Sequence, residues 1–342
     1  MKREVLVAIN GLLAMTAFGG EIQDGVIRPS NKPNAVQQQM IARQYGMFIH
    51  FGINTFHNQE WTDGTQPPTS YNPKTVDTDQ WAQTARDAGM KYVILTAKHH
   101  DGFCLWDSQH TDYDVANSPN KTDVVAALAA SCKKYGIQMG LYYSLWDRHE
   151  PTYKDDKKYV AYMLKQLTEL LTDYGPVCEL WLDGGWDKRR ENWDIPGVYA
   201  LVKKLQPECA VGVNWTIGLP DNPDAKNVKP DQQKEGFPIR YFPSDFRLGD
   251  PYLPGDPDPK LFSHDGQLFY LPFEATVCLN GKWFFNTRDS QLKTLGELES
   301  LFKRATAQDN ILILNSPPNR DGVMTEGNVK QLKALAERLG LH

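Results

Sequence analysis

The feature that most constrains the fold of this chain is a regular alternation of short apolar runs with longer amphipathic segments. The runs have the length and the β-branched or aromatic content of buried strands, and they lie at residues 48–52, 92–97, 139–144, 178–183 and 210–214. The amphipathic segments repeat apolar residues at helical spacing over residues 77–90, 123–136, 158–174 and 199–205. Strands that alternate with helices in this way form parallel sheets from βα units.

The second half of the chain follows the same pattern less regularly. Pro, Gly and Asp are frequent between residues 217 and 281, after which we expect a helix over 295–307, a strand over 311–314 and a helix ending at Leu339. No glycine-rich phosphate loop follows the first strand, which counts against a doubly wound sheet. We therefore predict an α/β fold, namely a (β/α)8 TIM-like barrel that is degenerate in its second half.

The beginning of the chain has the order of charged and apolar residues that is typical of an export signal. Two basic residues precede an apolar run over residues 5–18, and two glycines follow it. Glu4 and Asn10 weaken this pattern, so an ordinary N-terminal strand or helix is the alternative. We expect a signal peptide at residues 1–20, a single catalytic barrel domain over 21–342, and export to a periplasmic, extracellular or lysosome-like compartment.

Charge and cysteine content exclude several kinds of partner. The chain has 37 Lys and Arg against 42 Asp and Glu, a net charge of -5, and so lacks the cationic surplus that binding to a nucleic-acid backbone requires. Its five cysteines are an odd number without a close pair, which argues against a disulfide framework and a zinc-finger-type site. No other apolar run approaches the roughly 20 residues of a membrane span. We expect neither a nucleic-acid partner nor a membrane span.

Polar or aromatic side chains stand at the end of four successive predicted strands. His50 follows the first strand, His99 and His100 follow the second, Tyr142 belongs to the third and Asp183 ends the fourth. In a parallel barrel the carboxyl ends of the strands share one face, and that face carries the active site. Four such clusters at one topological level predict a functional site there.

Two carboxyl groups are candidates for chemistry on this face. Asp183 lies two residues after Trp181, so both side chains point to the same side of the strand, which we expect to be the barrel axis. Glu274 stands just ahead of an apolar run and near aromatic residues, surroundings that raise a carboxyl pKa and suit a general acid. The alternative for Glu274 is a buried ion pair with Arg288 or Arg240. One ionised and one protonated carboxyl on an aromatic-lined face are the minimum equipment for glycoside hydrolysis.

The histidines have two possible roles. His50, His99 and His100 could bind a metal ion together with Asp183, but no His-x-His follows the first strand and the chain has no HExxH motif. Neutral imidazoles that hydrogen-bond to sugar hydroxyls account for them without a metal. We therefore expect neither a metal nor another cofactor.

Five segments of the chain together resemble the α-L-fucosidases of glycoside hydrolase family 29. The resemblance runs in order from about residue 37 to residue 339 and includes a late segment at residues 312–322. Its most specific parts are the Lys-His-His-Asp-Gly-Phe and Trp-Leu-Asp-Gly blocks. The five segments are Gly46–Gly52, Glu60–Trp61, Thr96–Phe103, Gly140–Ser144 and Glu179–Gly185.

The resemblance implies roles for individual residues. Asp183 is the implied nucleophile of a retaining mechanism, and Glu274, which lies nine residues ahead of Trp283-Phe284, is the implied acid/base. This spacing is similar to that in a branch associated with α-1,3/1,4-linked fucose. If Glu274 is not the acid/base, Asp245 or Glu60 is next in order. The implied pocket for fucose contains His50, Glu60, Trp61, His99, His100, Tyr142, Trp181 and Trp283.

The sequence thus predicts a retaining, exo-acting α-L-fucosidase that releases terminal L-fucose from fucosylated oligosaccharides or glycoconjugate glycans. Trp61, Trp106, Trp181 and Trp283 are expected to face or flank the sugar. Many members of the family carry a C-terminal β-sandwich, which we do not expect here. The alternatives are a glycosidase for galactose-type sugars, a metal-dependent hydrolase, and a barrel that binds glycans without cleaving them.

Overall fold

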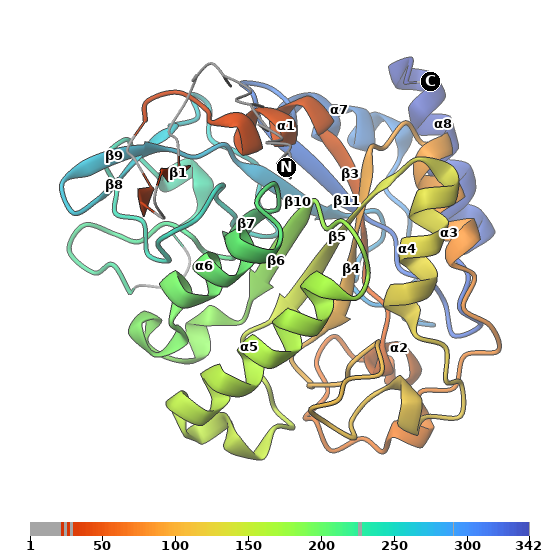
Figure 1. Ribbon diagram of the computed structural model, residues 1–342. Coiled ribbons are helices and arrows are strands. Elements are labelled where there is room, and N and C mark those ends of the chain that lie inside the picture. Colours follow the sequence, from red (N-terminus) through yellow and green to blue (C-terminus); the bar gives the residue numbers. More distant parts are fainter. Residues whose placement is uncertain (1–21, 24–25, 28–29, 225–227, 290, 342) are drawn as a thin grey trace, which may run out of the picture.

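Seven parallel strands form a curved sheet at the centre of the molecule, in the order β10–β11–β3–β4–β5–β6–β7 (Figure 1). The computed structural model describes residues 22–23, 26–27, 30–224, 228–289 and 291–341, so the expected signal peptide at residues 1–20 lies outside the described residues. The strands are β3 (Tyr45–Ile49), β4 (Tyr92–Lys98), β5 (Gln138–Ser144), β6 (Glu179–Asp183), β7 (Ala210–Val213), β10 (Glu274–Cys278) and β11 (Ile311–Asn315).

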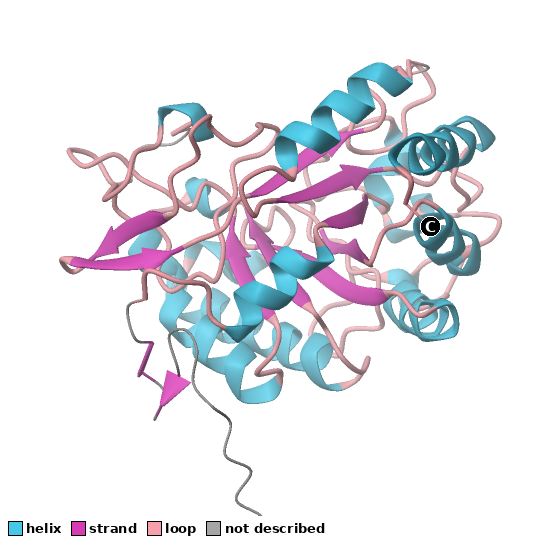
Figure 2. Ribbon diagram, turned by 90° about the horizontal axis from the view of Figure 1, so that it is seen from above, coloured by secondary structure: helices cyan, strands magenta, loops and turns pink. Residues whose placement is uncertain are grey.

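Helices surround this sheet, and Figure 2 shows the strands in the centre with the helices outside them. The longer helices are α1 (Ala35–Arg43), α3 (Thr78–Asp87), α4 (Val124–Tyr135), α5 (Asp156–Thr172), α6 (Ile195–Leu205), α7 (Leu295–Ala305) and α8 (Glu326–Leu339), with α2 (Ile53–His57) a short helix after β3. Short 3-10 turns lie at Pro68–Ser70, Val115–Asn117, Pro151–Lys154, Gly185–Asp187, Arg190–Trp193 and Pro230–Gln232. None of the helices in the described ranges is long and apolar enough to cross a membrane.

Two small hairpins lie outside the main sheet. β1 (Ile22–Gln23) pairs with β2 (Val26–Ile27), and β8 (Leu261–His264) pairs with β9 (Gln267–Tyr270), in both cases antiparallel. The β8–β9 hairpin projects from one side of the molecule (Figure 2). It occupies the part of the chain in which the sequence pattern of strands and helices is lost.

An extended segment at residues 245–248 occupies the eighth position of the barrel, between β7 and β10. The backbone nitrogen of Asp245 donates to Val211 at 2.7 Å on one side, and Arg247 donates to Pro272 at 3.0 Å on the other. Glu274 in turn donates to the carbonyl of Arg247 at 3.1 Å. The predicted (β/α)8-like barrel with a degenerate second half is thereby confirmed, with seven regular strands and one short extended segment.

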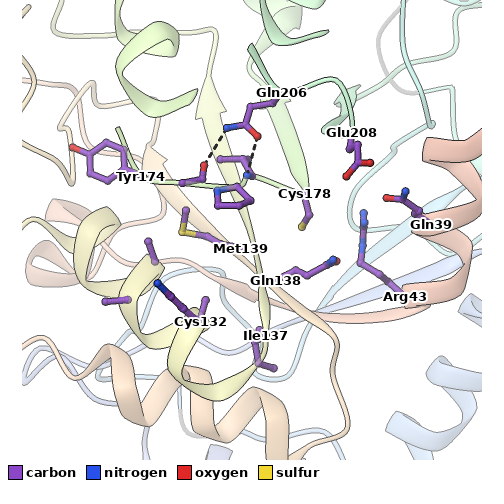
Figure 3. Close-up of a pocket in the computed structure, with 16 residues that line it drawn as sticks. Gln39, Arg43, Cys132, Ile137, Gln138, Met139, Tyr174, Cys178, Gln206 and Glu208 are labelled. Atoms are coloured by element: carbon purple, nitrogen blue, oxygen red, sulfur yellow. Dashed lines mark hydrogen bonds between the residues drawn. The ribbon is translucent and has the colours of Figure 1, made fainter. Parts of the chain in front are cut away.

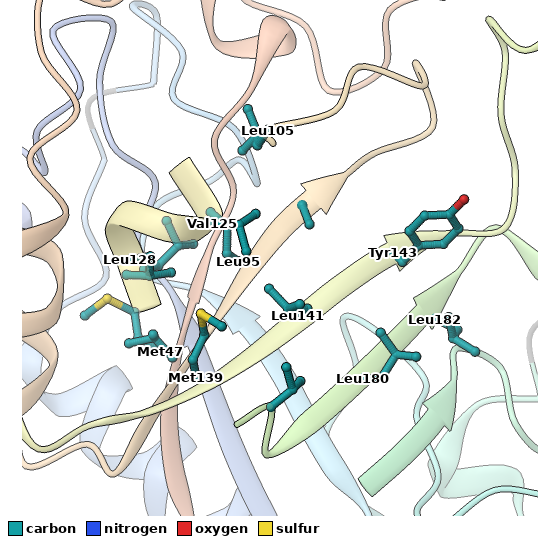
Figure 4. Close-up of a cluster of buried hydrophobic side chains, with 14 of the residues drawn as sticks. Met47, Leu95, Leu105, Val125, Leu128, Met139, Leu141, Tyr143, Leu180 and Leu182 are labelled. Carbon is teal, nitrogen blue, oxygen red and sulfur yellow. The ribbon is translucent and has the colours of Figure 1, made fainter. Parts of the chain in front are cut away.

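Strand side chains alternate between the barrel interior and the helices. Met47, Leu95, Leu141 and Leu180 point outward and belong to the core beneath the helices, as Figure 4 shows around Val125 and Leu128 of α4 (Figure 4). The inward side chains form a separate buried cluster that includes Phe48, Ile94, Tyr142, Trp181, Phe246 and Leu248. Because the alternation has a period of two, each inward series ends at the same face of the barrel.

The helices begin and end at residues whose chemistry favours those positions. Asp77, Asp123 and Asp155 cap α3, α4 and α5 by accepting hydrogen bonds from backbone nitrogens of the first turn. Gly136 ends α4 in the left-handed conformation, with φ 68°. The predicted helices over 77–90 and 123–136 are therefore confirmed to within a few residues.

Packing of the barrel interior depends on glycines that face large rings. A methyl group added at Gly212 would lie 2.5 Å from the Phe246 ring, which fills the interior at the eighth position. Gly296, on α7, has open space around its added methyl group. We expect Gly212→Ala to lower the free energy of unfolding by about 1–3 kcal/mol. Gly296→Ala should raise it by about 0.5–1 kcal/mol.

Urea denaturation of the two variants beside the unchanged protein tests this packing. A Gly212→Ala variant with unaltered stability would contradict the position of Phe246 in the barrel interior.

Candidate active site

A cavity of about 330 Å³ opens at the carboxyl ends of the strands. Figure 1 places α2, which follows β3, on this side of the barrel. Nine of the ten predicted site residues line the cavity: His50, Glu60, Trp61, His99, His100, Tyr142, Trp181, Asp183 and Trp283. Five further residues line it that were not among the predicted site residues: Phe48, Trp186, Asp250, Gly281 and Lys282.

Strand register explains why these residues meet. Tyr142 pairs with Trp181 and Ser144 pairs with Asp183 between β5 and β6, so the inward residues of both strands lie at matching heights. Tyr142, and not its neighbour Tyr143, lines the cavity, where its hydroxyl donates to Asp183 Oδ2 at 2.9 Å. Tyr143 points outward, where its hydroxyl donates to Gln166 Oε1 at 2.8 Å.

An irregularity at the end of β4 turns two histidines into the cavity. The register with β5 shifts between Thr96 and Lys98, and Lys98 points away from the cavity into a fully buried ion pair with Asp147 at 2.7 Å. His99 and His100 follow and contact each other, with ring centroids 4.2 Å apart. The buried ion pair therefore supports the loop that carries His99 and His100 and does not line the cavity.

Asp183 and Asp250 share one amide group. Asn214 Nδ2 donates to Asp183 Oδ1 at 3.0 Å and also contacts Asp250 Oδ1. Since both carboxylate oxygens lie at hydrogen-bond distance from the same nitrogen, they are no more than about 6 Å apart. This upper limit is below the spacing of about 6.5–9.5 Å between the carboxyl groups of inverting glycosidases and is compatible with the spacing of about 5–5.5 Å in retaining ones.

Burial makes both carboxyl groups reluctant to ionise. The pKa of Asp183 is raised to about 7 by burial and by the neighbouring charge of Asp250, against hydrogen bonds from Asn214 and Tyr142. Burial raises the pKa of Asp250 to about 6. Two carboxylates this close disfavour each other's charge, so the pair tends to hold one proton near neutral pH.

Glu60 is the third carboxyl group at the cavity. Its Oε2 accepts a hydrogen bond from the backbone nitrogen of Trp283 at 3.0 Å, whereas its Oε1 is buried without a hydrogen-bond partner in the described part of the chain. Burial raises the pKa of Glu60 above its ordinary value. Trp61, the next residue, is 50% exposed and marks the mouth of the cavity.

Glu274 is the one predicted site residue that the structure does not bring to the cavity. It is the first residue of β10 and therefore lies toward the amino ends of the strands, opposite the site. Its carboxyl accepts hydrogen bonds from the Tyr92 hydroxyl at 2.9 Å and from Trp181 Nε1 at 3.0 Å. Because the Trp181 ring lines the cavity, Glu274 supports the cavity floor from beneath. This position does not fit the predicted acid/base role.

A second buried carboxyl completes the group beneath the floor. Burial and the neighbouring carboxyl of Glu179, with which Glu274 shares a hydrogen bond, raise the pKa of Glu274 far above its ordinary value. Glu179 pairs with Arg43 at 3.2 Å. The cation near Glu274 is thus Arg43 of α1, which contacts Glu179. The alternative from the sequence, an ion pair of Glu274 with Arg288 or Arg240, is not what the structure shows.

Two other residues that the sequence suggested for the site also lie outside the cavity. Asp245 lies on the outer side of the barrel, where it accepts from the Tyr199 hydroxyl at 2.8 Å and pairs with Lys203 at 2.8 Å. Trp106 is fully buried away from the cavity and donates to Glu169 at 2.9 Å. Asp245 therefore does not line the site, and Trp106 belongs to the core and not to a sugar-binding wall.

A larger cavity, of about 720 Å³, lies at the amino ends of β5 and β6, near Arg43, Met139 and Cys178 (Figure 3). Glu208 is the only carboxylate among the residues that line it. The paired carboxyl groups, the histidines and the exposed Trp61 are instead at the smaller cavity, which is accordingly the candidate active site.

Comparisons with known proteins show which family the chain resembles. The family model described as alpha-L-fucosidase matches residues 65–342. The chain is 35% identical to "Alpha-L-fucosidase 1" of Arabidopsis thaliana over 313 residues, which cover 89% of this chain and 60% of the plant protein. It therefore spans less than two thirds of that relative's length.

Solved structures from the same family are also similar to this chain. A putative α-L-fucosidase from Bacteroides ovatus is 31% identical, with a TM-score of 0.73, over 89% of this chain and 55% of that one. A glycoside hydrolase 29 family member from an unknown rumen bacterium is 28% identical, with a TM-score of 0.73, over 90% of this chain and 57% of that one.

The position of Glu274 predicts a mild effect of replacing it. In Glu274→Gln the amide keeps the size of the protonated carboxyl and most of its hydrogen bonds, so we expect kcat/KM for a fucosylated oligosaccharide, whose leaving group needs a proton, to stay within about tenfold of the unchanged protein. Asp250→Asn should lower it by about 10²-fold or more. The two variants are compared by steady-state kinetics, and a larger loss for Glu274→Gln than for Asp250→Asn would restore Glu274 as the acid.

The raised pKa of Asp183 predicts how stability depends on pH. Between pH 4 and pH 7 the folded protein holds a proton on this carboxyl that the unfolded chain has released, so stability falls as pH rises through this interval. Asp183→Asn has no carboxyl to titrate, so it removes this fall in stability. We expect its Tm to exceed that of the unchanged protein by about 2 °C or more at pH 8 and to match it near pH 4. Equal Tm values at pH 8 would mean that Asp183 is not destabilised by burial.

Proposed function

The chain belongs to the α-L-fucosidase family, and on that premise we propose that it is a retaining, exo-acting glycosidase that releases terminal L-fucose from fucosylated glycans. The observation that carries the proposal is the hydrogen bonding of Asp183 and Asp250 to one amide inside an aromatic-lined cavity. The upper limit of about 6 Å between their oxygens supports double displacement, which uses carboxyl groups about 5–5.5 Å apart.

In the first step Asp183 attacks the anomeric carbon while Asp250 gives its proton to the departing glycosidic oxygen. The bond from the carbon to that oxygen breaks as the bond to Asp183 forms, and the rest of the glycan leaves as an alcohol. The hydroxyl of Tyr142 donates to Asp183 and favours its charged form, which is the form that attacks. The step uses the one proton that the pair holds near neutral pH when that proton is on Asp250.

In the second step water replaces the departed glycan. Asp250 takes a proton from the water, whose oxygen displaces Asp183 from the anomeric carbon. Each displacement inverts the configuration, so fucose is released with the configuration of the substrate.

The shape of the cavity supports action on a terminal sugar. Phe48 and Trp181 belong to the buried cluster of the barrel interior and close the cavity below, so a chain cannot pass through it. Aromatic walls suit the methyl group of fucose, which lacks a 6-hydroxyl, while the histidines meet the hydroxyls. Galactose-type sugars share this ring stereochemistry and are the competing substrates.

Glu60 is the second candidate for the acid/base because its Oε1 is unpartnered among the described residues and its pKa is raised. The dependence of rate on the leaving group separates the two carboxyls. We expect Asp250→Asn to lower kcat/KM strongly for a natural fucosylated oligosaccharide and much less for a nitrophenyl fucoside, whose leaving group needs no proton. If Glu60→Gln shows this pattern and Asp250→Asn does not, Glu60 takes the role.

Hydrolysis of a nitrophenyl α-L-fucoside, measured beside a branched fucosylated oligosaccharide and a nitrophenyl galactoside, tests the proposed activity. We expect release of fucose and a loss of about 10³-fold or more in kcat for Asp183→Asn. Activity on neither fucoside would overturn the proposal. Tight binding of the oligosaccharide without turnover would instead support a barrel that only binds glycans.

We further propose export of the protein, on the strength of the residue pattern at positions 1–20. N-terminal sequencing of protein recovered from outside the cytoplasm should begin near residue 21. A chain that retains Met1 and stays with the cytoplasmic fraction would contradict export.

A further inference from the structure

We propose that Asn315, Asn54 and Ser144 fix which ring nitrogen of each cavity histidine carries the proton, and thereby give the sugar site a set order of hydrogen-bond acceptors and donors. The argument uses backbone groups, because a backbone N–H can only donate and a carbonyl can only accept. The identity of the ligand rests on the proposed function, whereas the protonation pattern does not.

Asn315 determines which ring nitrogen of His50 carries the proton. Its Nδ2 lies 2.8 Å from the carbonyl oxygen of Trp283, and since that oxygen only accepts, the amide nitrogen must face it. The amide oxygen, Oδ1, is therefore the atom that lies 2.8 Å from His50 Nδ1. An amide oxygen only accepts, so His50 Nδ1 carries the proton. Nε2 of His50 then presents a lone pair.

Asn54 sets the opposite pattern at His99. Its Oδ1 accepts from the backbone nitrogen of Thr62 at 3.0 Å, which fixes the orientation of the amide. Its Nδ2 then donates to Asp101 Oδ2 at 2.9 Å and to His99 Nδ1 at 3.3 Å. His99 Nδ1 is thus an acceptor, and its proton is on Nε2.

Ser144 sets the proton of His100. The hydroxyl donates its one hydrogen to the carbonyl oxygen of Trp146 at 2.5 Å. The same oxygen lies 2.6 Å from His100 Nδ1 and can only accept there, so His100 Nδ1 carries the proton. Nε2 of His100 therefore presents a lone pair, 3.6 Å from Asp183 Oδ2.

The rings hold a single proton each because they are buried. Relative exposure is 4% for His50, 7% for His99 and 1% for His100. Burial lowers the pKa of His50 and of His100 to about 3 and lowers that of His99 well below its ordinary value. At neutral pH each imidazole is therefore neutral, and the outer nitrogens of His50 and His99 have no partner in the described ranges.

The cavity consequently offers Nε2 of His50 as an acceptor, Nε2 of His99 as a donor and Nε2 of His100 as an acceptor. A free hydroxyl can meet any of the three, because it both donates and accepts. A carboxylate, a fluorine or an ether oxygen can meet only His99. The site is therefore selective for a neutral sugar with unsubstituted hydroxyls and discriminates against acidic sugars and O-methylated ones.

Nitrogen NMR of the whole protein labelled with ¹⁵N-histidine tests the protonation pattern directly. Long-range correlations link the protons on the ring carbons to the ring nitrogens, and the nitrogen chemical shifts distinguish a nitrogen that carries a proton from one that does not. Single His→Gln variants assign the signals. We expect the proton on Nδ1 of His50 and His100 and on Nε2 of His99 at pH 7. A proton on Nε2 of His50 or His100, or on Nδ1 of His99, would overturn the proposal.

A pair of serine variants tests the positioning role. In Ser144→Ala, His100 loses the acceptor for Nδ1, so we expect its proton to move to Nε2, beside Asp183, and KM for a nitrophenyl fucoside to rise about tenfold. Ser131 is also buried, on α4, where its hydroxyl contacts Thr78 and Asp79, so Ser131→Ala is the matched control. It should leave both the His100 signals and KM unchanged.

The two variants also separate this inference from the proposed function. Unchanged His100 signals in Ser144→Ala would overturn the positioning role, even if the protein is an active fucosidase. The expected protonation pattern in a protein that cleaves no fucoside would uphold the inference and overturn the function.

Discussion

In-register hydrogen bonding between parallel strands decides where the side chains of the site lie. Each strand turns alternate residues inward, and the register from β3 to β7 aligns the last inward residues at one face. Tyr142 and Asp183 reach the cavity for this reason, although they come from different strands. The extended segment at residues 245–248 extends the same geometry to the eighth position and brings Asp250 to the same face.

Polar groups occupy both ends of the barrel interior, with aromatic rings between them. At the carboxyl ends, Asp183 and Asp250 face the open cavity and can exchange a proton with a ligand. At the amino ends, Glu274 is enclosed with Glu179 and has no access to one. Trp181 separates the two groups and contacts Glu274 through its indole nitrogen. Two pairs of carboxyl groups with raised pKa values thus differ in position. Asp183 and Asp250 face the cavity, whereas Glu274 and Glu179 lie beneath its floor.

The regular half of the fold and most of the site follow from the sequence by simple rules. A period of two predicts the inward face of each strand, and that parity correctly selects Tyr142 over Tyr143. The first strand was expected at residues 48–52 but is Tyr45–Ile49; the shift leaves the parity of Phe48 and His50 unaltered. Aspartate caps and a terminal glycine likewise mark the helix ends, because their chemistry is local to the backbone that they contact.

Asp250, the proposed acid/base carboxyl, could not be predicted in the same way. Glu274 precedes its apolar run, so it begins a strand, and in a parallel barrel the beginning of a strand is remote from the site. Asp250 continues the inward series of Phe246 and Leu248, an alternation of a few residues that is bounded by Pro243 and Pro251. Such a short segment carries too little periodicity to be recognised as a strand, and only hydrogen bonds to Val211 and Pro272, far apart in the sequence, define it.

The most direct test of the assignment is the configuration of the fucosyl azide formed when azide rescues two alanine variants. Removal of Asp183 lets azide attack the anomeric carbon directly, so Asp183→Ala should give fucosyl azide of inverted, β configuration from an α-fucosyl donor with a good leaving group. Removal of Asp250 leaves the covalent step intact, so Asp250→Ala should give the retained, α product. An α product only with Glu60→Ala or Glu274→Ala, and none with Asp250→Ala, would contradict the pairing of Asp183 with Asp250.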